Sequence, residues 1–158
     1  MQDYQNRGYQ QGRQQGGYQH RDRNEPEPYR PSFNKTDFAD VTALEINEVA
    51  DKKGKEFKPI RTNQIRNFFS HFNTIKNEYK IIKINKQPIE QLDTSLILIK
   101  PKLAYAKGRN LAVEPFQRLI FEVIDLVYNS KNKEKAYNNF FEFVEAIVAY
   151  HKYYGGKD

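Results

Sequence analysis

The sequence has no cysteine, no tryptophan, a single methionine and no long apolar run. Without cysteine there are no disulfide bonds and no thiolate metal sites, and a reducing compartment is favoured. No segment approaches the roughly 18 consecutive apolar residues of a transmembrane helix, and the N-terminus lacks the apolar segment of a secretory signal. We therefore expect a soluble, cytoplasmic protein without a membrane partner.

The patterns that catalytic and metal sites need are also missing. The three histidines do not form a His-x-x-x-His pair for a metal, and no paired carboxylates are evident. One hypothesis to weigh is an enzyme that acts on RNA by general acid–base chemistry at His151, with Lys152, Tyr153 and Tyr154 beside it. A lone histidine on an aromatic helix is more often a packing or surface residue. We therefore expect no enzyme, no catalytic residue, no metal site and no cofactor.

Positive charge is in modest excess. The chain has 26 lysines and arginines against 20 acidic residues, a formal net charge of +6. Such a balance favours an anionic partner such as nucleic acid. The acidic residues are mixed among the basic ones. A protein whose surface charge only maintains solubility would have the same excess of positive charge.

The composition changes near residue 33. Residues 1–32 contain seven Gln, five Arg, four Gly and four Tyr, but no Leu, Ile, Val or Phe. Such a segment cannot bury enough apolar surface to offset the entropy of ordering it, so we expect residues 1–33 to be disordered. Its composition resembles low-complexity segments that contact RNA or self-associate weakly. An extension without a dedicated role is equally consistent with it.

Residues 34–158 have the pattern of one all-α domain. Apolar residues recur at steps of three and four, which predicts about five helices in a compact bundle, over residues 36–53, 62–84, 88–108, from about 113, and 133–153. Gly54 is expected to end the first helix and Gly108 the third. Pro101 should kink the third helix, because the carbonyl of Ile97 loses its helical partner.

The most basic part of the domain is residues 98–109, which has four cations and one tyrosine. At 100° per residue, Ile99, Leu103 and Ala106 form an apolar stripe. Along one edge of it lie Lys102, Tyr105 and Arg109, and along the other lie Lys100 and Lys107. Cations with an interleaved ring suit a polyanion, although side chains that snorkel from an ordinary amphipathic helix give the same pattern.

Two further arginines, Arg61 and Arg66, lie at the start of the second helix. There a cation opposes the helix dipole unless an anion or an acidic partner is present.

Three motifs together resemble a known family. They are Thr62-x-Gln64-Ile65-Arg66, the run from Lys100 to Arg109 with the sequence KPKLAYAKGR, and Phe143 with Glu145, Ala146, Ala149 and Tyr150. In order, spacing and helical context they are similar to the small α-helical subunit of type III-A CRISPR effector (Csm) complexes. The resemblance covers roughly residues 36–156, and the middle motif is its most specific part.

The resemblance implies a non-enzymatic subunit of an antiviral ribonucleoprotein. Several copies would stack beside the guide RNA and its paired target RNA, and contact one another, the backbone-forming subunits and the large signalling subunit. It implies RNA-binding roles for Lys102, Tyr105 and Arg109, supported by Arg61 and Arg66, with Lys100 and Lys107 on the other edge. Contacts would be independent of sequence, since base pairing carries the specificity. A protein-interaction adaptor that does not touch RNA is the alternative, because helical bundles serve many functions.

Overall fold

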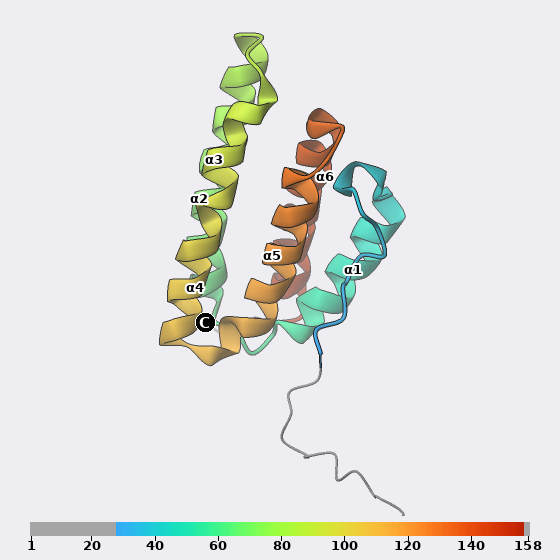
Figure 1. The fold of residues 1–158 in the computed structure, drawn as a ribbon. Coiled ribbons are helices and arrows are strands. Elements are labelled where there is room, and N and C mark those ends of the chain that lie inside the picture. Colours follow the sequence, from blue (N-terminus) through green and yellow to red (C-terminus); the bar gives the residue numbers. More distant parts are fainter. Residues whose placement is uncertain (1–27, 157–158) are drawn as a thin grey trace, which may run out of the picture.

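The computed structural model describes residues 28–156, and these residues are helical, without a strand among them (Figure 1). The helices are α1 (Ala43–Glu56), α2 (Thr62–Ile84), α3 (Leu92–Ile97), α4 (Ile99–Arg109), α5 (Glu114–Tyr128) and α6 (Lys133–Tyr153). There are also three single 3-10 turns: η1 (Phe38–Asp40) precedes α1, η2 (Ile89–Gln91) lies between α2 and α3, and η3 (Leu111–Val113) lies between α4 and α5. The prediction of an all-α bundle is confirmed. Of residues 1–33, which the sequence predicts to be disordered, residues 1–27 lie outside the described residues, whereas Ser32 and Phe33 are held on α5 by Glu122.

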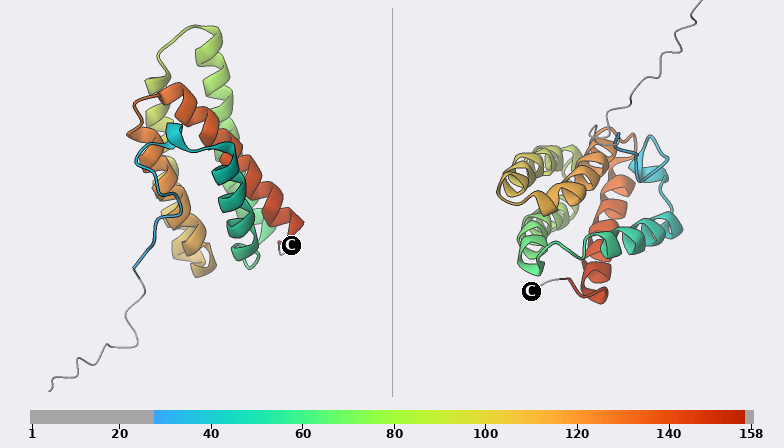
Figure 2. Two further views of the ribbon diagram at one scale, coloured as in Figure 1. Left: turned by 90° about the vertical axis from the view of Figure 1, so that its right-hand side faces the viewer. Right: turned by 90° about the horizontal axis from the view of Figure 1, so that it is seen from below.

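The helices pack around α5 and α6. In Figures 1 and 2, α1 lies along α6 on one side of the bundle, while α2 runs antiparallel to α3 and α4 on the other side. The turn between α2 and α3 projects beyond the rest of the bundle. This arrangement puts the start of α2 and the end of α4 side by side at the opposite end.

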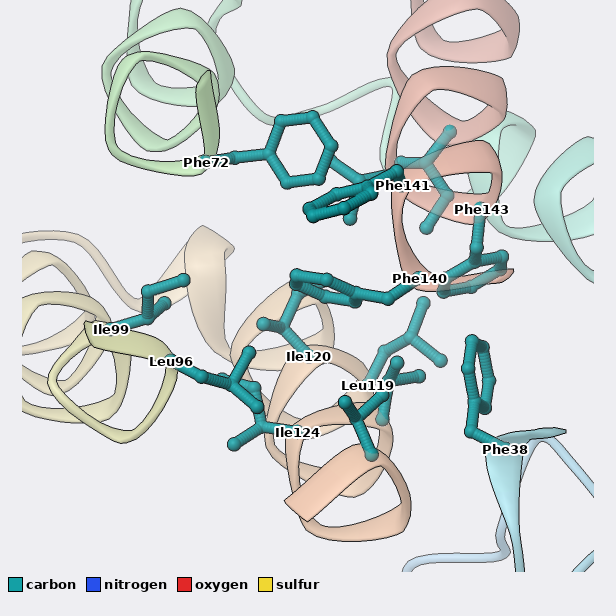
Figure 3. Packing of buried hydrophobic residues seen from close by; sticks show 14 of the residues in the cluster. Phe38, Phe72, Leu96, Ile99, Leu119, Ile120, Ile124, Phe140, Phe141 and Phe143 are labelled. Carbon is teal, nitrogen blue, oxygen red and sulfur yellow. The ribbon is translucent and has the colours of Figure 1, made fainter. Parts of the chain in front are cut away.

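The core is rich in aromatic side chains. Phe140 and Phe143 of α6 are fully buried, as are Phe72 of α2 and Leu119 of α5 (Figure 3). The rings of Phe72 and Phe140 meet edge to face with centroids 5.6 Å apart. Such pairs contribute about 0.5–1.5 kcal/mol beyond the burial of their area. These buried rings of α6 and α2 and the apolar side chains of α5 together fill the centre of the bundle.

Pro101 divides the predicted third helix in two. It is the third residue of α4 and has no N–H to donate to the carbonyl of Ile97. The helix is interrupted at Leu98, whose N–H closes the last turn of α3 on the carbonyl of Thr94 at 3.1 Å. The predicted single helix is therefore two helices, α3 and α4, that follow one another across Leu98. Ile99 remains buried in the core after it.

The expectation that Gly54 ends the first helix is wrong. Gly54 lies within α1, which continues to Glu56. It is buried where α1 crosses α6, and a Cβ there would lie 2.4 Å from the Cβ of Tyr150 and 2.9 Å from the backbone nitrogen of His151. The glycine therefore allows a close approach of two helices. Gly108 likewise lies inside α4, one residue before its end.

The start of the first helix also differs from the prediction. It begins at Ala43 rather than near residue 36, because Thr42 and Glu45 form a reciprocal capping box there. The chain before it already packs on the bundle. The Glu122 carboxylate of α5 accepts hydrogen bonds from the backbone N–H groups of Ser32 and Phe33 at 2.9 Å. The buried Phe33 ring then joins the core.

Candidate nucleic-acid interface

A groove of about 890 Å³ runs between α2 and α4, a size within the usual range of ligand sites. Apolar side chains of the core form its floor, among them Phe68, Leu103 and Phe116. Its walls are polar or cationic. From α2 and the residue before it come Arg61, Asn63, Gln64, Asn67 and His71, and from α4 and the residue after it come Lys102, Tyr105, Arg109 and Asn110.

The helical phase of α4 explains which side chains reach the groove. Ile99 and Leu103 point into the core, and one edge of that apolar stripe faces α2. Lys102, Tyr105 and Arg109 are on this edge and line the groove together. The grouping predicted from the sequence is therefore present as geometry.

Arg61 joins this set from the start of α2. Its position is fixed by the chain end that packs beneath it, since the Thr62 hydroxyl donates to the Gly156 carbonyl at 3.3 Å. The buried His151 ring donates from Nε2 to the carbonyl of Ile60 at 3.0 Å. The two contacts hold the connection between α1 and α2 against the end of α6.

Within the described residues, the cations of the groove have no carboxylate partners. Among residues 28–156, Arg61, Lys102 and Arg109 form no ion pair, and no Asp or Glu lines the groove. The guanidinium of Arg109 lies 5.8 Å from the centre of the Tyr105 ring, whose residue is 69% exposed. The site thus offers three uncompensated charges and an accessible ring.

The cations on the other edge of α4 are paired. Lys100 forms an ion pair with Asp125 and lies 5.2 Å from the centre of the Phe121 ring. Lys107 lies 3.3 Å from Glu114. The pKa of the Glu114 carboxyl is held below its usual range, first by a hydrogen bond from Arg118 and then by one from Lys107. These lysines join α4 to α5 and do not line the groove.

Arg66 is placed apart from the other predicted residues. It is exposed on α2 but does not line the groove. It lies two residues after Gln64, which turns it about 200° around the helix axis. The structure therefore separates Arg66 from Arg61, although the two are close in the sequence.

The candidate catalytic residue of the enzyme alternative, His151, lies in the core. His151 is 1% exposed and its ring is held by the Ile60 carbonyl, so substrate does not reach it. Within the described part of the chain, no cluster of three His, Asp or Glu side chains could hold a metal ion.

Sequence reasoning missed the amide side chains of the groove and His71. Gln64 accepts a hydrogen bond from the Asn110 side chain at 3.0 Å, which ties α2 to the end of α4. Lys102 Nζ lies 3.3 Å from Nδ1 of His71. The spacing of Gln64, Asn67 and His71 along α2 could have indicated part of the groove, because these three residues share one face of the helix. The sequence does not say which helix packs beside that face.

The family model of Csm2 type III-A matches residues 40–157, which includes every α-helix of the structure. The chain belongs to the Csm2 type III-A family. It is therefore a small subunit of a type III-A CRISPR (Csm) complex, and the resemblance found in the three motifs is confirmed.

Two curated relatives bear the name CRISPR system Cms protein Csm2. The protein from Enterococcus italicus is 28% identical over 124 residues, which cover 74% of this chain and 86% of the relative. The protein from Streptococcus thermophilus is 27% identical over 108 residues, which cover 68% and 82%. No solved structure matches the chain. None of the helices in residues 28–156 is long and apolar enough to cross a membrane.

Proposed function

We propose that this subunit binds RNA through the groove between α2 and α4, as a non-catalytic part of the Csm complex. Its ligand is the guide RNA paired with target RNA. The observation that carries the proposal is the cationic groove itself: Arg61, Lys102 and Arg109 face one carboxylate-free space beside the exposed Tyr105 ring. An unneutralised cluster of this kind is stabilised by a polyanion.

The mechanism is electrostatic. Each cation neutralises a phosphate and releases counterions, which favours binding of any sequence. The Tyr105 ring adds a surface on which a base or sugar can stack. Base pairing between guide and target supplies the specificity, as in other RNA-guided effectors. The protein recognises the backbone and its shape.

A single copy binds weakly, and affinity comes from several copies along one RNA. Neighbouring copies, the backbone subunits and the large signalling subunit are therefore partners in binding. We place this assembly in the cytoplasm, where it serves antiviral defence.

The test compares two double variants with the same loss of charge. Lys102→Ala with Arg109→Ala removes unpaired cations of the groove, whereas Lys100→Ala with Lys107→Ala removes cations that are paired with α5. The affinity of each for single-stranded RNA is measured between 25 and 200 mM salt. For a single strand, each lost phosphate contact lowers the log–log slope by about 0.7, so we expect a drop of about 1.4 in the groove variant and little change in the other.

An unchanged slope in the groove variant would contradict the proposal and favour a protein-interaction adaptor. Equal losses in both variants would show that total charge, rather than the groove, governs binding. Incubation of the protein with labelled RNA, with and without divalent metal, tests the non-catalytic role. Cleavage that disappears in His151→Ala would refute it.

A further inference from the structure

His71 and Lys102 face each other across the groove, from α2 and α4. The Lys102 Nζ lies 3.3 Å from the His71 Nδ1. A lysine ammonium has donors only, so Nδ1 of His71 accepts this hydrogen bond and the ring is neutral. Its proton then resides on Nε2. The contact therefore depends on the uncharged form of His71.

Within residues 28–156, the charged side chains that line the groove are cations, and Lys102 is the one that acts on His71. Arg61 lines the groove from the start of α2, and Lys102 and Arg109 line it from α4. No Asp or Glu from the part of the chain that the structure describes lines it. Partial burial lowers the pKa of the His71 ring below its usual range, and the Lys102 charge lowers it further. Protonation of the His71 ring would place a second positive charge beside that of Lys102, which is unfavourable while the groove is empty.

An anion between the two side chains reverses this balance. A phosphate oxygen accepts hydrogen bonds from Lys102 Nζ and, once the ring is protonated, from Nδ1–H of His71. Both bonds are charge-assisted and stronger than the neutral contact that they replace. The proton comes from solvent, and no covalent bond changes.

We propose that His71 and Lys102 together hold one phosphate of the bound RNA between α2 and α4, and that His71 takes up a proton as the phosphate binds. This inference rests on the proposed function, because it assigns a phosphate to the groove. It adds to the groove a binding residue that the charge pattern of the sequence does not reveal.

The direction of the pH effect follows from linkage. The pKa of His71 is low in the free protein and is raised by the phosphate. RNA affinity therefore increases as the pH falls through the interval between the two values. Above and below that interval the affinity is flat, because free and bound protein then carry the same number of protons.

The test measures RNA affinity and the ionisation of His71 in the full-length protein. Binding of a single-stranded 12-nucleotide RNA is followed from pH 8.5 to pH 5.5 at constant ionic strength. Since one unit of pKa shift equals a factor of ten in affinity, we expect binding to tighten by about tenfold. In His71→Gln, which keeps a neutral hydrogen-bonding group, the change should be under about twofold. His20→Gln is the matched control and should retain the full dependence.

A histidine titration by NMR supplies the second readout. We expect the pKa of His71 to rise when RNA is added. In Lys102→Gln it should rise already in the free protein, because the Lys102 charge that lowers it is gone. The rise on addition of RNA in the unmodified protein is the effect that a purely structural role for the pair would not produce.

The outcomes separate the two proposals. If RNA binds at pH 8 with the expected salt slope but the pKa of His71 does not move, the phosphate clamp is wrong and the proposed function stands. The clamp is equally overturned if His71→Gln keeps the full pH dependence. If RNA does not bind at any pH, both proposals fail.

Discussion

Two glycines within helices should respond in opposite ways to the same substitution. Gly54 is buried between α1 and α6, and the Cβ of an alanine there would lie 2.4 Å from Tyr150 and 2.9 Å from the backbone of His151. The backbones must separate to admit it. Gly108 lies in α4 with no atom within 4 Å of the added Cβ. The substitution at Gly54 tests how closely α1 and α6 pack. The substitution at Gly108 gives the intrinsic preference of a helix for alanine over glycine.

The magnitudes follow from two opposing effects. Replacing glycine by alanine inside a helix stabilises by about 1 kcal/mol. Overpacking a close contact costs about 1–3 kcal/mol, and the contact at Gly54 involves backbone that cannot rotate away. We expect Gly54→Ala to lower the free energy of unfolding by up to about 2 kcal/mol, which is up to several degrees in Tm. Gly108→Ala should raise it by about 0.5–1 kcal/mol.

Urea and thermal unfolding of both variants, followed by circular dichroism, measure these differences. Stabilisation of both proteins by a similar amount would refute the reasoning, because it would mean that α1 and α6 do not approach as closely as the structure shows. Destabilisation of both would point to a turn conformation at Gly108 instead of a helix.

Two other predictions concern the fold. Glu122→Ala removes the acceptor that holds residues 29–33 on α5, so the free energy of unfolding should fall by about 1–3 kcal/mol and protease should cut near residue 33 faster; an unchanged cleavage rate would contradict this anchor. Burial raises the pKa of Tyr137, and its hydrogen bond to Asp93 raises it further. The unfolded chain therefore loses this proton near pH 10, before the folded one does, and stability falls as the pH rises through 10. In Tyr137→Phe, unfolding measured from pH 8 to 11 should show a smaller fall, and an equal fall would rule out the contribution of this hydroxyl.

Periodicity predicted α2, α5 and α6 well because each has a broad apolar face that the bundle buries. The bounds of α2 and α6 agree with the sequence-based ranges. The prediction that Gly54 ends the first helix is wrong because a glycine at a helix end and a glycine at a helix crossing look alike in sequence. The difference lies in Tyr150, which is distant in the chain.

In the groove, too, the sequence predicts what one helix determines by itself and does not predict what depends on the packing of distant segments. The grouping of Lys102, Tyr105 and Arg109 depends only on the turn of one helix, so the sequence contains it. The pairing of Lys100 and Lys107 with carboxylates of α5 and the approach of His71 depend on how helices pack. Those contacts join residues distant in the sequence, and no local pattern marks them.

Photo-crosslinking of RNA to this subunit within the native Csm complex tests the central claim most directly. Tyr105 in the groove and Tyr153 at the end of α6 are 69% and 78% exposed, so accessibility alone predicts similar yields at both. If the groove holds the RNA, peptides from residues 99–109 carry the crosslinks and Tyr153 carries few. Crosslinks at Tyr153 without any between residues 99 and 109 would contradict the account.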